Sequence, residues 1–146
     1  MTATIREDHV FTDTYTCVLG KLSTISDPSH KSKWIYSAFP KVKVETENMY
    51  PILIIQSPDV TYTPFTFREK RGPIRFTFDI FSTNAEQMDD LASQVVNKME
   101  LNEDNFLASG IAVMRFVGTS YNQYPRENFR VHNKTLNYEF DFGWYP

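Results

Sequence analysis

The alternation of apolar and polar residues is regular in the segment 75–81. Phe76, Phe78 and Ile80 alternate with Arg75, Thr77 and Asp79, so the apolar side chains of an extended chain would all lie on one face. A period of two over this length is typical of a strand with one buried and one solvated face. The sequence therefore predicts a half-buried strand here.

The period changes after residue 83 and predicts a helix. Apolar residues now recur at spacings of three and four, which places them along one side of a helix: Met88, Leu91, Val95 and Met99. Thr83 precedes Glu86 by three residues and Asn84 precedes Gln87 by three, so either residue is a candidate N-cap. We expect a strand that leads directly into a helix.

Four further segments have a readable pattern. Residues 10–22 have helical spacing, and Asp8 is a possible N-cap. The continuous apolar run at 52–55 predicts a strand covered on both faces. Residues 111–117 and 136–142 alternate again and predict two more strands.

The expected order is therefore helix, strand, strand, helix, strand, strand. This order predicts an α+β fold with a mixed four-stranded sheet, in which a crossover helix joins two β-hairpins and the helices pack on one face. We expect one domain over residues 1–146 with long loops at 23–49, 58–73 and 118–130.

Composition limits the class of protein. The 12 Phe and 8 Tyr residues supply large side chains for a core, and no apolar run is long enough to span a membrane. The first residues lack a secretory signal, and the single cysteine, Cys17, is expected to be a buried thiol in a reducing cytoplasm. A net charge of −3 argues against a protein that grips nucleic acid over its whole surface.

The sequence offers little that is typical of catalysis. Its five glycines are scattered and form no phosphate-binding loop, and its three histidines have no second ligand at metal spacing. Asp79, Glu139 and Asp141 are expected on the outward face of strands, where two carboxylates on neighbouring strands could act as acid and base. The plainer interpretation is a solvated or partner-covered face. We expect no enzyme, no metal and no cofactor.

One loop combines basic and aromatic residues. Arg68, Lys70 and Arg71 follow Tyr62, Phe65 and Phe67, a mixture that can stack on single-stranded nucleic acid or dock on an acidic protein surface. A second polar and aromatic segment, 118–130, is expected to form a hairpin tip or arm. Aromatic and arginine side chains often anchor protein interfaces. The candidate interface residues in the two segments are Phe65, Phe67, Arg68, Lys70, Arg71, Tyr121, Tyr124 and Arg126.

Three stretches of this sequence resemble a known family. They are YPILIIQ at 50–56, IRFTFDIFSTNAEQMDDLASQV at 74–95 and FRVHNKTLNYEFDF at 129–142. In pattern and order they are similar to the tail-terminator and tail-completion proteins of long-tailed bacteriophages, which join tails to heads. The likeness covers residues 50–142, and the helix expected at 10–22 agrees in position.

This resemblance implies a structural protein of the virion, made in the host cytoplasm and located in the tail or neck. It implies a homo-oligomeric ring, typically a hexamer, that caps the tail tube and contacts the tube protein and the head-completion or connector protein. DNA would pass through the ring without sequence recognition, and no membrane is involved. Two alternatives stay open: a small cytoplasmic nucleic-acid-binding or adaptor protein that uses loop 62–71, and a hydrolase that uses Asp79 and Glu139.

Overall fold

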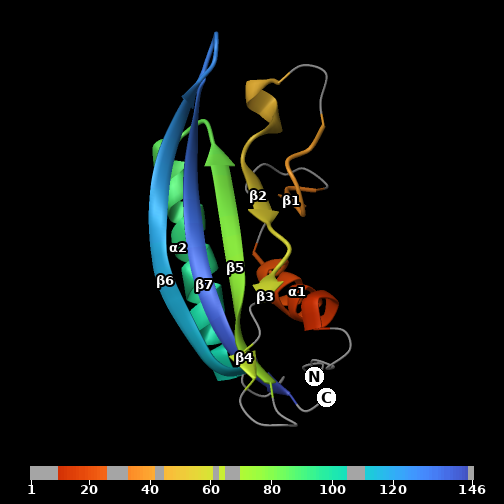
Figure 1. Cartoon of the computed structure of the whole chain (residues 1–146). Helices are drawn as coiled ribbons and strands as arrows, with labels where there is room; N and C mark the ends of the chain where they lie inside the picture. Colours follow the sequence, from red (N-terminus) through yellow and green to blue (C-terminus); the bar gives the residue numbers. More distant parts are fainter. Residues whose placement is uncertain are drawn as a thin grey trace.

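The computed structural model describes residues 10–25, 33–41, 45–60, 63–64, 70–104 and 111–144 (Figure 1). It contains two α-helices, one short 3₁₀ helix and seven strands in the described residues. In chain order these elements are α1 (Val10–Leu22), β1 (Ile35–Tyr36), η2 (Glu47–Met49), β2 (Ile52–Ile55), β3 (Asp59–Val60), β4 (Thr63–Pro64), β5 (Lys70–Ser82), α2 (Ala85–Leu101), β6 (Ile111–Pro125) and β7 (Arg130–Trp144).

The strands form one mixed sheet, which confirms the expected α+β class. Its main path runs in the order β1-β2-β5-β7-β6, and β3 and β4 pair with the part of β5 that β2 leaves free. β1 is parallel to β2, and the other pairs are antiparallel. Strands β5 and β6 therefore run in the same direction with β7 between them. The two hairpins and the crossover helix α2 are as predicted, although α2 connects strands that are not direct neighbours.

The main core lies between the sheet and the two α-helices. Alternate residues of β5, including Phe76 and Phe78, pack with Val18 of α1 and with Leu91 and Val95 of α2 in one buried cluster. The predicted periods of β5 and α2 are both confirmed, because the apolar set is buried and Arg75 is exposed. In Figure 1, α2 lies against the face of the sheet that β5 and β7 share. The helices pack on one face, as expected.

A second, smaller cluster covers the other face of β2. All four residues of β2 are buried, and Ile52 and Ile54 pack with Tyr50 and Val131 rather than with the main core. Phe129 and Phe81 are packed against the same cluster. The run at 52–55 is continuously apolar because the main core covers one face of β2 and the smaller cluster covers the other. This confirms the predicted strand with two buried faces.

The three expected loops contain regular structure that the pattern did not reveal. Segment 23–49 contributes β1 and η2, and segment 58–73 contributes β3, β4 and the start of β5. The largest correction concerns 118–130, where β6 continues to Pro125 and β7 begins at Arg130. These polar residues are in strands because β6 and β7 supply each other's backbone hydrogen bonds, which needs no apolar alternation.

The junction between β5 and α2 corrects one detail of the capping prediction. Asn84 alone is the N-cap, and its side chain accepts hydrogen bonds from the backbone N–H groups of Glu86 and Gln87. The Gln87 side chain accepts from the buried Ser82 hydroxyl at 2.7 Å, and that hydroxyl accepts from the Asn84 N–H at 3.1 Å. Ser82 therefore completes the junction, while Thr83 has no capping bond.

Candidate functional site

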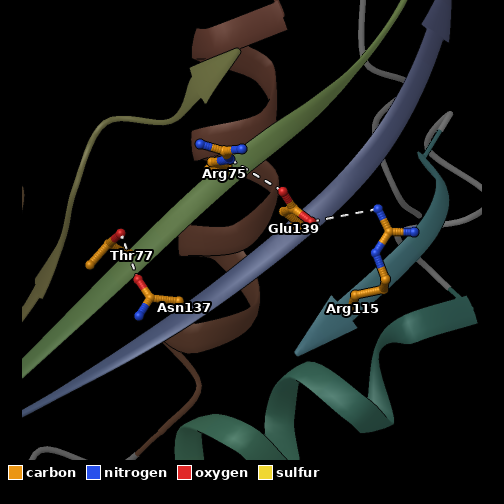
Figure 2. A network of polar contacts seen from close by, with 5 residues as sticks. All are labelled: Arg75, Thr77, Arg115, Asn137 and Glu139. Carbon is orange, nitrogen blue, oxygen red and sulfur yellow. Dashed lines mark hydrogen bonds and ion pairs between the residues drawn. The ribbon is translucent and has the colours of Figure 1, made fainter. Parts of the chain in front are cut away.

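The outer face of the sheet, opposite α2, carries a network of compensated charges (Figure 2). Glu139 of β7 lies between two arginines from the neighbouring strands. Its carboxylate accepts from the Arg75 Nε at 3.2 Å and forms an ion pair with Arg115 at 3.6 Å. Two residues further along β5, the Thr77 hydroxyl donates to the side-chain oxygen of Asn137 at 3.3 Å. This part of the outer face is polar, and its charges offset one another.

The two carboxylates considered as an acid–base pair are not brought together. Asp79 lies opposite Thr135 in the strand register, whereas Glu139 lies opposite Arg75, four residues away on β5. At roughly 3.3 Å per residue this separates them by about 13 Å along the sheet, farther than the roughly 5–9.5 Å between paired catalytic carboxylates.

Each of these carboxylates has partners of its own. The Thr135 hydroxyl donates to Asp79 at 2.6 Å, and the Gln56 amide donates to its other oxygen. Asp141 is a β7 residue whose side chain lies outside the described part of the structure. Among the described residues, no group of three or more His, Cys, Asp or Glu side chains could hold a metal ion.

The tip of the β6–β7 hairpin is fastened to the segment before β2. Arg126 donates to the Glu45 carboxylate at 2.6 Å, and the Tyr50 hydroxyl donates to the other oxygen of Glu45. The Phe129 ring lies 6.2 Å from the Tyr50 ring. Partial burial disfavours the Glu45 charge, but the hydrogen bonds from Tyr50 and Arg126 hold the Glu45 pKa below its ordinary value. Burial and the Glu45 charge raise the pKa of Tyr50.

Arg126 is thus bonded to Glu45 within the chain, and the two tyrosines predicted with it lie on the edge strand. Tyr121 and Tyr124 are 44% and 39% exposed on β6, the edge strand of the sheet. The Tyr121 ring stacks on His132, and its hydroxyl lies 2.6 Å from the His132 Nδ1. Phe116 and Val117, also on β6, are 46% and 60% exposed. Their alternation with neighbouring residues is typical of a half-buried strand, so their exposure was not predicted from the sequence.

The other predicted group lies at the opposite end of the sheet. Lys70 and Arg71 begin β5 and pair with Trp144 and Gly143 of β7, whereas the far end of β5 pairs with His132 near the hairpin tip. Phe65, Phe67 and Arg68 lie outside the described residues. The two candidate segments therefore do not form one site.

A groove lies between α2 and the β6–β7 hairpin. Its volume is about 550 Å³, and an ion pair between Lys134 and Asp89 at 2.6 Å lies at its side. The remaining lining is partly apolar and includes Ala92, Val96, Phe116 and Leu136. The groove is open because α2 packs mainly against β5 and β7 rather than against β6.

Comparisons with known proteins do not assign this chain to a family. No family model matches the sequence, and no curated protein matches it. Among solved structures, the chain is similar to one from the virion of a native gene transfer agent particle, with 10% identity and a TM-score of 0.46. The match covers 86% of this chain and 84% of the other. A TM-score in this range does not establish a shared fold. No described helix is long and apolar enough to cross a membrane.

Proposed function

We propose that this chain is a structural subunit of a phage-like virion that forms a ring at the neck, capping the tail tube and joining it to the head connector. One observation carries the proposal: the order α1, β2–β5 hairpin, α2, β6–β7 hairpin is the order of the tail-terminator and tail-completion family that the sequence resembles. The carboxylates do not form an acid–base pair, so the geometry favours assembly over hydrolysis.

A ring of identical subunits needs two different contact surfaces on each subunit, because a head-to-tail contact is heterologous. The basic segment that contains Arg68, Lys70 and Arg71 is our candidate for one surface. The exposed side of α2 is the candidate for the other, because Asp90, Glu100 and other carboxylates on it are exposed. Opposite charges on the two surfaces would favour one orientation of neighbouring subunits.

The outer face of the sheet is our candidate for the channel wall. Arg75 and Arg115 flank Glu139, so the face is hydrated and carries charges of both signs. A wall with many uncompensated cations would retain the phosphate backbone of DNA, because each phosphate contact adds to affinity. Compensated charges suit a channel through which DNA passes without being held.

The experiment is a mass measurement of the purified chain together with electron microscopy of particles that contain charge variants. We expect a stable ring for the natural sequence. Arg68→Glu with Arg71→Glu should leave the fold intact, reduce ring formation and cause separate heads and tails to accumulate. Lys33→Glu with Lys41→Glu makes the same change in net charge at exposed positions outside the proposed contact and should leave assembly unchanged.

Three results would contradict this proposal. Normal virions from the Arg68→Glu, Arg71→Glu variant would remove the basic segment from the assembly surface. A monomer that retains single-stranded oligonucleotide in a salt-dependent manner would favour the nucleic-acid-binding alternative that uses loop 62–71. Absence of the chain from purified particles would reject the virion assignment itself.

A further inference from the structure

The outer edge of β6 lacks the features that normally protect an edge strand. From Phe116 to Tyr124 no residue is charged or a proline, in a chain whose overall charged fraction is 23%. Apart from Gly118, the residues of this stretch are exposed. Within the described part of the chain, β6 pairs with β7 on one side and with no strand on the other. Proteins usually blunt such edges with charges, prolines or short strands, because an open edge is a template for another strand.

The opposite edge of the same sheet is protected in those ways. It consists of β1, β3 and β4, each two residues long, and β4 includes Pro64. Among the described residues, this edge therefore offers no strand of matching length to β6 of a neighbouring subunit. The longest free edge available to β6 in the described structure is another β6.

We propose that β6 pairs antiparallel with β6 of a second copy, about a two-fold axis that passes beside Tyr121. The register of β6 on β7 is unbroken from Gly118 to Pro125, after a shift between Phe116 and Gly118, so this is its regular part. Strand addition at an exposed edge supplies main-chain hydrogen bonds and continues the sheet into the partner. The contact is isologous, so each copy uses the same surface.

The pleat of the strand restricts the register. Residues that face one another across a pair must lie on the same face of the sheet, so only an axis that passes beside a residue is allowed. An axis beside Tyr121 pairs Gly118 with Tyr124 and leaves Pro125, which has no N–H, outside the paired segment. Space is open where a Cβ would be at Gly118, so the facing Tyr124 ring can lie over it.

This two-fold contact goes beyond the proposed ring and does not depend on it. A two-fold contact closes on itself and cannot propagate a ring, so it uses a different surface from the basic segment and α2. Loss of the β6 contact would therefore leave ring formation intact, and loss of the ring would leave the β6 pair intact. The pair would also bring two of the α2–β6 grooves onto the same face of one continuous sheet.

Oxidative cross-linking tests both the pairing and its register. In a Cys17→Ala background, Tyr121→Cys places the two thiols directly opposite one another, within the distance that a disulfide requires. Thr119→Cys is the matched control on the same strand face, because its copies would be separated by about 13 Å, or four residues. We expect a covalent dimer from Tyr121→Cys and none from Thr119→Cys. The reverse result would overturn the proposed register.

Charge tests the pairing without a covalent bond. Ser120→Lys with Asn122→Lys places lysines on facing positions of the pair, and like charges directly opposite are unfavourable. We expect the dimer dissociation constant, measured by analytical ultracentrifugation, to rise on the order of tenfold or more. Thr12→Lys with Ser37→Lys adds the same charge at exposed positions outside β6 and α2 and should leave the dissociation constant unchanged. A chain that is monomeric at every concentration, or equal effects of both variants, would overturn the proposal.

Discussion

Strands β5 and β6 both pair with β7 along most of their length, yet they differ in what covers them. β5 has 13 residues, β2, β3 and β4 on its other side, and α2 over its apolar face. β6 has 15 residues, an outer edge that no described strand covers, and little contact with α2. β5 therefore alternates regularly because other parts of the same chain bury one of its faces. Backbone pairing with β7 is enough to make β6 a strand without that alternation.

The largest expected effect compares one phenylalanine from each strand. Phe78 is fully buried, whereas Phe116 is 46% exposed. We expect Phe78→Ala to lower the free energy of unfolding by about 3–5 kcal/mol, and Phe116→Ala by about 1 kcal/mol or less. Urea melts of the two variants would measure this. Equal losses would show that β6 is covered as fully as β5.

A smaller effect is expected where β5 leads into α2. Asn84→Ala removes the side chain that caps α2 and should cost about 1 kcal/mol. Thr83→Ala should stay within roughly 0.5 kcal/mol, since Thr83 has no capping bond. Thermal or urea melts would distinguish the two residues. A larger loss at Thr83 would contradict the observed capping geometry.

The smallest effect concerns the hairpin tip, where β6 turns into β7. Because the folded Glu45 pKa lies below its ordinary value of 4.5, its ion pair adds stability above that pH and loses it as the pH falls through the folded pKa. The pair is partly exposed, so we expect less than about 1 kcal/mol. Urea melts at neutral and acidic pH should show a smaller acid loss for Arg126→Ala than for the natural sequence. Identical pH profiles would show that the pair contributes nothing.

The sequence was most informative where one face of an element is buried by its own chain. The spacing of Phe76, Phe78 and Ile80 predicted the buried face of β5, and the spacing of Met88 to Met99 predicted the buried side of α2. The sequence pattern limited the N-cap of α2 to two candidates, Thr83 and Asn84. Local pattern could not choose between them, because the choice depends on Ser82, a small hydroxyl with no periodic signal.

Features that depend on contacts between distant segments were missed. β1 is held by parallel pairing with β2. A strand of two residues is too short for an apolar–polar alternation to predict it from the sequence. Arg126 looked available for a partner, but its bond to Glu45 joins residues 81 positions apart. Asp79 and Glu139 share a face as expected, yet only the strand register shows how far apart they lie. The spacing of residues in the sequence predicts on which face of the sheet a side chain lies. The distance between two side chains on that face depends on the pairing register of the strands.

The position of β7 between β5 and β6 has a consequence for how this chain folds during synthesis. β7 pairs with both β5 and β6, and the Arg75–Glu139 contact joins residues 64 positions apart. When β2, β5 and α2 have left the ribosome, one side of β5 still lacks the strand that will cover it. Contacts of such high sequence separation slow folding, because a long loop must close before they form. The nascent chain therefore carries an open, apolar sheet edge until β7 emerges, and this interval is when it most needs protection from aggregation.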